Sequence, residues 1–288
     1  MLDHVAHAVP RWQEVWGRYA VGFGAEWSSG GPGLGFAPAQ LRFGNGARVE
    51  VLMPHATETN DFLARFLEHS GPGPHHVTFK VPDLEVAIGR ARQHGFEPIG
   101  IDVSDPEWME AFIHPKQASG VVVQLAQQSV AWTSAPPEDY PTTRRPRSDG
   151  SGPVPPGALL RVTHAVADLD AAAALFVGLL DARVADGGAG GGLRWMELAW
   201  PGPLGIRLVA PEGPGDGTAA LTRWLGARSG RVHHLELTAE EPGSIPDARR
   251  PDPESVGARP WDAGRDDPGW EIAPAANAGL RLVVHPPD

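Results

Sequence analysis

One short pattern occurs four times in this chain of 288 residues, and it restricts the possible folds more than any other feature. Each copy is a run of alternating apolar residues, which predicts a β-strand, and the first three copies continue into a helix signal. The copies read LDHVAHAVPRWQEV from Leu2, HHVTFKVPDLEVAI from His75, LRVTHAVADLDAAA from Leu160 and HHLELTAEEPG from His233. The first and second copies are spaced almost as the third and fourth are. The pattern therefore predicts two halves, each an internal duplication.

Local signals extend each copy into a larger unit. Pro10, Pro82-Asp83 and Ala167-Asp168 mark helix starts after the first three strands. In the first unit, strands are predicted at residues 40–43 and 48–52, separated by the hairpin signal Gly44-Asn45-Gly46. In the second unit, strands are predicted at residues 111–114 and 120–126. Each unit is thus expected to contain a strand, a helix and about three further strands.

Two stretches interrupt this pattern. Residues 129–157 are rich in Ser, Pro, Gly and Arg, a composition typical of a flexible linker. We therefore predict an N-terminal domain at residues 1–128, a linker at 129–157 and a C-terminal domain at 158–288. The second stretch, Glu240 to Pro268, occupies the place of the fourth helix, and we interpret it as a functional lid or a partly disordered insertion.

Composition excludes several classes of function. The formal net charge of -11 disfavours binding to nucleic acid or to acidic lipid surfaces. Cysteine is absent, so a metal would have to be held by histidine, carboxylate or amide groups. The segment MLDHVAHAVP lacks the regions of a signal peptide, and no apolar run reaches the roughly 18 residues of a membrane span. A soluble cytoplasmic protein with a small-molecule ligand is the expectation.

Side-chain direction selects the candidate site residues. Successive side chains of a strand point to opposite faces, so the polar residues between core-facing apolar residues share the other face. This rule places two histidines, a glutamate and a glutamine in one predicted cleft: His4, Glu50, His76 and Gln124. Each of them alone would more often be a surface residue or a satisfied core polar group. Their matched positions in the duplicated unit favour a shared site.

The chemistry of these four residues predicts a divalent metal. Two imidazoles, a carboxylate and an amide oxygen suit Zn, Ni, Co, Mn or Fe(II), and leave room for waters or substrate oxygens. Five further residues are candidates for substrate binding, although core packing is the commoner role of the aromatic ones: Phe36, Thr78, Lys80, Trp108 and Phe112.

At these residues the chain resembles the vicinal-oxygen-chelate superfamily, and its N-terminal half is most similar to the methylmalonyl-CoA epimerase and glyoxalase I branch. The motifs are LDHVAHAV, RVEVLMP, NDFLARFLEHSGPGPHHVTFKV and FIHPKQASGVVVQL, which are specific together and weak singly. The resemblance covers both halves. It implies an α+β fold of tandem domains, each a pair of βαβββ units forming a U-shaped, eight-stranded cleft, with ligands at His4, Glu50, His76 and Gln124.

Two departures separate the chain from epimerases. Those enzymes usually have glutamate at the position of Gln124, with glutamine or glutamate at that of Glu50. They also have a glutamate base in the loop corresponding to residues 28–35, where this chain has none. We therefore expect chemistry other than simple epimerisation, with Glu50 as the base that takes a proton next to a carbonyl.

The leading prediction is a metal-dependent lyase or isomerase of the glyoxalase family, acting on a small carbonyl or thioester compound through a metal-stabilised enediolate. Two alternatives stay open: a metal-free, antibiotic-binding resistance protein of the same fold, and an extradiol-type dioxygenase, which prefers two histidines and one carboxylate. A monomer and a homodimer fit equally, because two fused domains already supply the pairing that single-domain relatives obtain by dimerising.

The C-terminal half is expected to lack the metal. The positions that match the ligands carry Arg161, Arg207, His234 and Val283, and arginine cannot coordinate a cation. Alternation places Arg161, Arg207 and Arg281 on the cleft face beside Glu236. Either they are solvated or paired with Glu236 and its neighbours, or they form an anion-binding cleft. This half is predicted to be a degenerate domain that shapes or caps the site.

Overall fold

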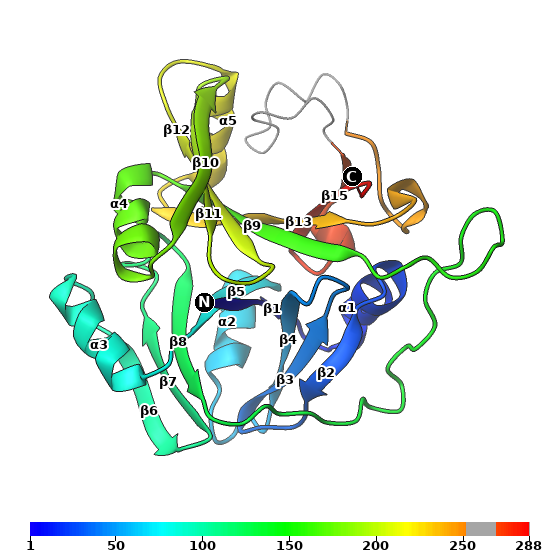
Figure 1. The fold of residues 1–288 in the computed structure, drawn as a ribbon, viewed down its shortest axis with the longest axis horizontal. Helices are drawn as coiled ribbons and strands as arrows, with labels where there is room; N and C mark the ends of the chain where they lie inside the picture. The colour runs from blue at the N-terminus through cyan, green and yellow to red at the C-terminus, as the bar shows by residue number, and fades with distance from the viewer. Residues whose placement is uncertain (252–268, 288) are drawn as a thin grey trace.

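Two mixed β-sheets, one from each half of the chain, form the fold (Figure 1). The structure, a computed structural model, describes residues 1–251 and 269–287. The first sheet has the order β2-β3-β4-β1-β5-β8-β7-β6 and consists of β1 (Leu2–Ala8), β2 (Glu26–Gly30), β3 (Gly35–Arg42), β4 (Arg48–His55), β5 (Gly73–Lys80), β6 (Ile99–Asp105), β7 (Trp108–Ile113) and β8 (Val122–Gln128). The second has the order β10-β11-β12-β9-β13-β15-β14 and consists of β9 (Ala158–Val166), β10 (Arg183–Gly190), β11 (Leu193–Ala199), β12 (Gly205–Pro211), β13 (Gly230–Thr238), β14 (Trp270–Ile272) and β15 (Arg281–His285).

Strand pairing reproduces the predicted units. In the first sheet, β1 runs parallel to β4 and β5 runs parallel to β8, so each unit places its first strand beside its last. The two units join where β1 pairs antiparallel with β5. The second sheet repeats this plan, with β9 and β13 at its centre. Among the described residues it has seven strands, where the prediction was eight.

Helices begin where the sequence signals lie. The Asp83 side chain accepts a hydrogen bond from Val86 N and begins α3 (Leu84–Gln93), and Asp168 begins α4 (Leu169–Ala173) in the same way. In each half the first helix widens into π-helical turns: α1 (Gln13–Trp16) continues as η1 (Gly17–Gly22), and α4 continues as η2 (Ala174–Leu179). Helices α2 (Phe62–Ser70) and α5 (Asp216–Leu225) precede the second unit of each half.

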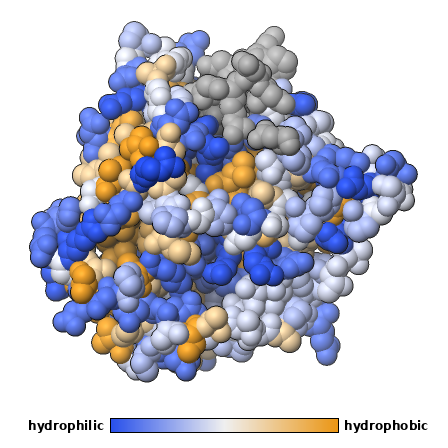
Figure 2. Space-filling view, viewed as in Figure 1, coloured by the Kyte–Doolittle hydropathy of each residue, from blue (hydrophilic) through white to orange (hydrophobic). Residues whose placement is uncertain are grey.

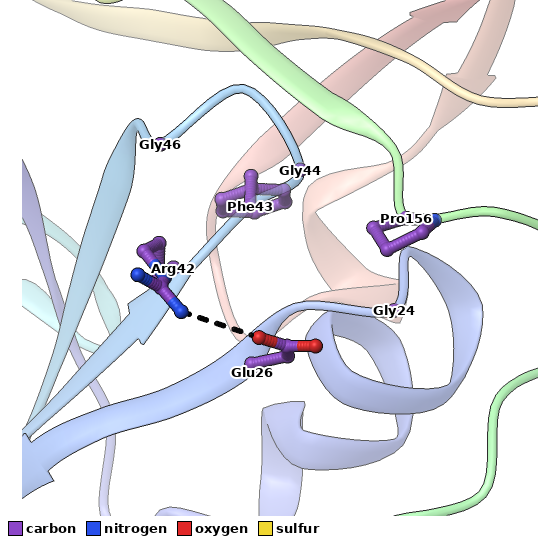
Figure 3. A pocket seen from close by; sticks show the side chains of 7 residues that line it. All are labelled: Gly24, Glu26, Arg42, Phe43, Gly44, Gly46 and Pro156. Atoms are coloured by element: carbon purple, nitrogen blue, oxygen red, sulfur yellow. Dashed lines mark hydrogen bonds and ion pairs between the residues drawn. The ribbon is translucent and has the colours of Figure 1, made fainter.

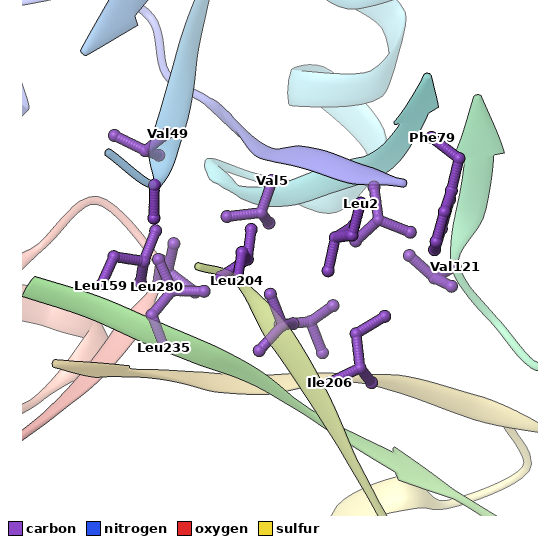
Figure 4. Close-up of a cluster of buried hydrophobic side chains, with 14 of the residues drawn as sticks. Leu2, Val5, Val49, Phe79, Val121, Leu159, Leu204, Ile206, Leu235 and Leu280 are labelled. Atoms are coloured by element: carbon purple, nitrogen blue, oxygen red, sulfur yellow. The ribbon is translucent and has the colours of Figure 1, made fainter. Parts of the chain in front are cut away.

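The main core lies between the two sheets (Figure 4). Val5 and Phe79 of the first sheet face Leu235 and Ile206 of the second, and all four are buried. Each sheet therefore hides its apolar central face against the other half, because removing that area from water is the main source of stability. The opposite face of the first sheet carries the predicted cleft residues.

Two equivalent contacts fasten the halves together. The buried His7 on β1 donates from Nε2 to the carbonyl oxygen of Ala278 at 2.8 Å, and the buried His164 on β9 donates to that of Ser119 at 2.9 Å. Gly120 follows Ser119 with φ +84°, and a side chain there would collide with the backbone of Gly230. The turn before β8 is therefore shaped for close contact with the other half.

The segment of residues 129–157 packs against the first sheet, although its composition is typical of a flexible linker. The Tyr140 hydroxyl donates to Ala25 O at 2.9 Å, and Ser134 Oγ bonds to both the N and the O of Gly30. Trp132 stacks on Trp108 near the opposite edge of that sheet. Because the core continues between the halves, the division into domains at this segment stays a prediction.

Most of the predicted insertion, Glu240 to Pro268, lies outside the described residues. The prediction of a lid or a partly disordered insertion therefore concerns residues outside the described part. Its described part contains η3 (Pro242–Ser244) and a bridge between Arg249 and Glu271. A last short helix, η4 (Pro274–Ala276), precedes β15. Within the described ranges, no helix is long and apolar enough to span a membrane. On the visible face, apolar residues form separate groups among hydrophilic ones (Figure 2).

Candidate metal site

Four adjacent strands bring the predicted ligands to one face of the first sheet. His4 lies on β1 and His76 on β5, which pair with each other, while Glu50 and Gln124 lie on the flanking strands β4 and β8. All four side chains are buried. One ligand atom each from His4, Glu50 and His76 lie within 4.8 Å of one another.

Two β-bulges orient the histidines. The pairing of β1 with β5 shifts register between Leu2 and His4, and again between Val5 and His7. As a result, Asp3 Oδ2 lies 2.8 Å from His4 Nδ1, and the Nδ1 atoms of His75 and His76 are also 2.8 Å apart. Strict alternation would turn Asp3 and His75 to the other face, so sequence reasoning missed both as partners of the ligands.

The Nε2 atoms of both histidines lie near the Glu50 carboxylate. The Nε2 atoms of His4 and His76 each lie 3.5 Å from Glu50 Oε2. His76 Nε2 is buried and has no hydrogen-bond partner in the described part of the chain. A buried ring nitrogen normally has a partner. A divalent ion fits here, because two imidazoles, one of them oriented by the Asp3 carboxylate, with an adjacent carboxylate are a common ligand arrangement.

Electrostatics link Glu50 to His4. Burial alone would raise the pKa of Glu50, but His4 and His76 together hold it well below its usual value. Burial would likewise lower the pKa of His4, yet Glu50 and the hydrogen bond to Asp3 raise it to about 9. Gln40 on β3 donates to Glu50 Oε1 at 2.8 Å, a contact that the sequence did not suggest. The metal-free site therefore holds an ion pair between His4 and Glu50.

A chain of hydrogen bonds connects Gln124 to this centre. The Thr78 hydroxyl lies 2.9 Å from His4 Nε2 and donates to Gln124 Oε1 at 2.6 Å. Gln124 Nε2 in turn donates to Glu110 Oε2 at 2.6 Å, which also accepts from Trp108 Nε1 at 2.7 Å. The amide oxygen is thereby turned toward the histidines. Glu110 was missed because the strand was predicted to begin one residue later.

The predicted substrate residues lie on both sides of the ligands. Phe36 packs against Phe62 of α2, which covers one end of the cleft face. Phe112 stands opposite Gln124 on β7. Lys80 Nζ lies 3.5 Å from the centroid of a Trp108 ring. Their contact with a substrate stays a prediction, as does metal binding by the four ligands.

The second sheet has charged pairs at the equivalent positions. Arg207 stands opposite Glu197 as Glu50 stands opposite Gln40, and Arg207 Nε donates to Glu197 at 3.1 Å. Arg161 pairs with Glu197 and, at 3.0 Å, with Glu236, while Arg281 pairs with Glu271. Carboxylates thus neutralise these arginines, the first of the two predicted alternatives. An anion-binding role for them stays a prediction.

Two surface hollows lie away from the proposed ligands. One, of about 250 Å³, is lined by Gly24, Glu26, Arg42, Phe43, Gly44, Gly46 and Pro156 (Figure 3). Its charged residues, Arg42 and Glu26, are exposed and pair with each other at 3.4 Å. The other hollow, also about 250 Å³, lies in the second half beside Arg161 and Glu197. Neither contains a group of ligating side chains.

Comparison with known proteins finds a matching family and similar folds. Residues 3–128 match the Glyoxalase/Bleomycin resistance protein/Dioxygenase superfamily. A substituted 4-hydroxymandelate synthase from Streptomyces coelicolor superposes with a TM-score of 0.56 and 16% identity, covering 82% of this chain and 70% of its own. That similarity extends over both halves and shows the predicted α+β fold with two similar halves.

Smaller structures match about half of the chain. Methylmalonyl-CoA epimerase from Mycobacterium tuberculosis is 26% identical, with a TM-score of 0.40, and the match covers 45% of this chain and 88% of the epimerase. A hypothetical protein from Bacillus halodurans C-125 is 24% identical, with a TM-score of 0.41, over 46% of this chain and 98% of its own. No curated protein matches the sequence.

Proposed function

We propose, from the match of residues 3–128 to the Glyoxalase/Bleomycin resistance protein/Dioxygenase superfamily, that this half binds one divalent metal and uses it in catalysis. The proposed ligands are His4, Glu50, His76 and Gln124. The buried His/Glu/His group carries the proposal, since its ligand atoms lie within 4.8 Å of one another. His76 Nε2 supports it, because within the described ranges this buried atom has no hydrogen-bond partner. Zn, Ni, Co, Mn and Fe(II) all suit such nitrogen and oxygen ligands.

We propose that the reaction is a glyoxalase-like lyase or isomerase reaction on a small carbonyl or thioester compound. A bound ion would stabilise negative charge on a substrate oxygen. Glu50 is the one carboxylate among the four proposed ligands, so we assign it the role of the base that removes the proton next to the carbonyl. Gln40 holds one oxygen of Glu50, and Asp3 holds the ring of His4, so both side chains keep fixed orientations. Such preorganisation lowers the cost of reaching the reactive geometry.

Proton exchange tests this assignment without knowledge of the natural substrate. The purified, metal-loaded protein would be incubated in deuterated buffer with hemithioacetals of methylglyoxal, 2-oxo acids and acyl thioesters, and NMR would follow loss of the proton next to the carbonyl. We expect exchange with at least one of these classes. Glu50→Gln should slow it by about 100-fold or more. Equal exchange by the wild type and Glu50→Gln would refute the role of Glu50.

The group of His4, Glu50 and His76 also favours a second candidate reaction. Two histidines and one carboxylate are the ligand type of non-haem Fe(II) oxygenases, and Glu50 supplies the carboxylate here. We propose iron-dependent oxygenation as the alternative reaction. Oxygen consumption by the Fe(II)-loaded protein with catechols distinguishes the two, because the lyase or isomerase reaction proceeds without oxygen. Catalysed proton exchange under nitrogen, with no oxygen uptake in air, would eliminate the oxygenase.

A further inference from the structure

Lysine is rare in this chain, and one lysine lies in the proposed site. Of the 24 basic residues counted as lysine or arginine, only Lys80 and Lys116 are lysines. Lys116 is exposed in the turn before β8. Lys80 follows His76 and Thr78 along β5 on the same face, because alternate residues of a strand point the same way. This face of the first sheet therefore carries one of the two ammonium side chains of a chain whose other basic residues are arginines.

The Lys80 ammonium has no hydrogen-bond acceptor in the part of the chain that the structure describes. Its Nζ is buried, and among the described residues no acceptor lies within hydrogen-bond distance. It rests on Trp108, which Glu110 holds at 2.7 Å on one side and Trp132 covers by stacking, with ring centroids 5.2 Å apart. The aromatic face favours a cation at this point but accepts none of its three N–H bonds. The site thus holds a fixed cation with unused donors.

The neighbouring carboxylates are already engaged. Asp3 is bonded by His4 and, at 3.0 Å, by Arg48. Glu50 is bonded by Gln40, and Glu110 by Gln124 and Trp108. These three carboxylates, with the cations of Arg48 and Lys80, leave one negative charge when the imidazoles are neutral. A divalent ion changes this to one positive charge, which a single monoanion balances.

We propose that Lys80 binds an anionic oxygen of the substrate, so that the site takes small carboxylic acids in preference to neutral carbonyl compounds. This inference rests on the proposed function, because the metal supplies the positive charge that the substrate balances. Lys80 lies two residues beyond Thr78, which is opposite Gln124. Two strand residues span about 7 Å, which is within the length of a small molecule. One such molecule can therefore place its anionic oxygen at Lys80 and its other oxygens at the metal.

The protonation state of Lys80 agrees with this role. Burial lowers the pKa of Lys80 to about 8, although Asp3 and Glu50 act in the opposite direction. The side chain is therefore mostly charged at pH 7. It donates as a compact ammonium, which differs from the wide planar guanidinium of arginine.

Matched ligands of different charge test the proposal. Isothermal titration of the Mn²⁺-loaded protein would compare pyruvate with methyl pyruvate, and acetate with acetamide, in the wild type, Lys80→Met, Lys80→Arg and the control Lys116→Met. We expect the carboxylates to bind the wild type and Lys116→Met, and to bind Lys80→Met about tenfold more weakly or worse. Lys80→Arg should retain part of the affinity. The neutral ligands should show no dependence on Lys80.

Metal content, measured on the same samples, separates the two levels of the argument. A wild type without stoichiometric Mn²⁺ would contradict the proposed function. Normal metal content in all variants, with carboxylates that bind the wild type no better than neutral ligands or bind Lys80→Met equally well, would overturn the role of Lys80 alone.

Discussion

Metal affinity should depend steeply on pH, because the metal and a proton compete for His4. In the metal-free protein, burial lowers the pKa of His4, but Glu50 and Asp3 together raise it to about 9. The imidazole must be neutral to bind a metal, so binding releases this proton. At pH 7 only about 1% of the metal-free molecules have a neutral His4, and the apparent Kd should be about 100-fold weaker than above pH 9. The expected slope is about tenfold per pH unit.

Competition titrations with Zn²⁺ and a chromophoric chelator between pH 6.5 and 8.5 would measure this slope. Calorimetry in buffers of different ionisation enthalpy would count the released protons, and we expect about one. Asp3→Asn removes one of the two groups that raise the His4 pKa, so its slope should level off at a lower pH. Asp168→Asn, remote in the second half, is the control. A Kd that stays constant over this range in the wild type would refute the ion pair between His4 and Glu50.

Three further predictions concern stability and the support of the ligands. Burial lowers the pKa of His7 and of His164 to about 4, below the 6.5 of an unfolded chain, so stability is full above pH 6.5 and falls as the pH drops toward 4. Each of these two histidines should lower the free energy of unfolding by about 2 kcal/mol at pH 5. Equal urea-unfolding free energies at pH 7 and 5 would contradict this. Glu110→Gln should weaken Zn²⁺ binding about tenfold, measured by the same competition titration, because Gln124 loses its charged hydrogen-bond acceptor; unchanged affinity would exclude this support. Asp168→Ala should lower the unfolding free energy by about 1 kcal/mol in urea, because it removes the helix cap; a loss near zero would contradict the cap.

Alternation and repetition predicted much of the first sheet. Val5 and Val77 alternate with polar residues, and this fixed which face each strand buries. The same alternation could not show what covers that face, since a helix and a second sheet bury apolar side chains equally well. Leu235 and Ile206 of the other half now occupy that place. Pairing across the interface depends on contacts far apart in sequence, such as His7 with Ala278.

Sequence reasoning placed the four proposed ligands on one face but missed much of their support. Asp3 reaches His4 through a β-bulge, and a bulge breaks the period on which the reasoning relied. Glu110 lies in the first half of β7, before the predicted start of that strand, and strand boundaries are poorly marked in sequence. In the second half, Glu197 pairs with two arginines because the sheet places β11 beside β12, a neighbour relation that no local pattern revealed.

The central claim is that the first half holds one metal ion on the His/Glu/His group, and elemental analysis of the purified wild type beside His76→Ala tests it directly. We expect about one equivalent of a divalent metal in the wild type and far less in His76→Ala, with both proteins folded by circular dichroism. Metal absent from the wild type after incubation with Zn²⁺, Mn²⁺ or Fe²⁺, or equal metal in both proteins, would contradict the claim and favour a metal-free binding protein.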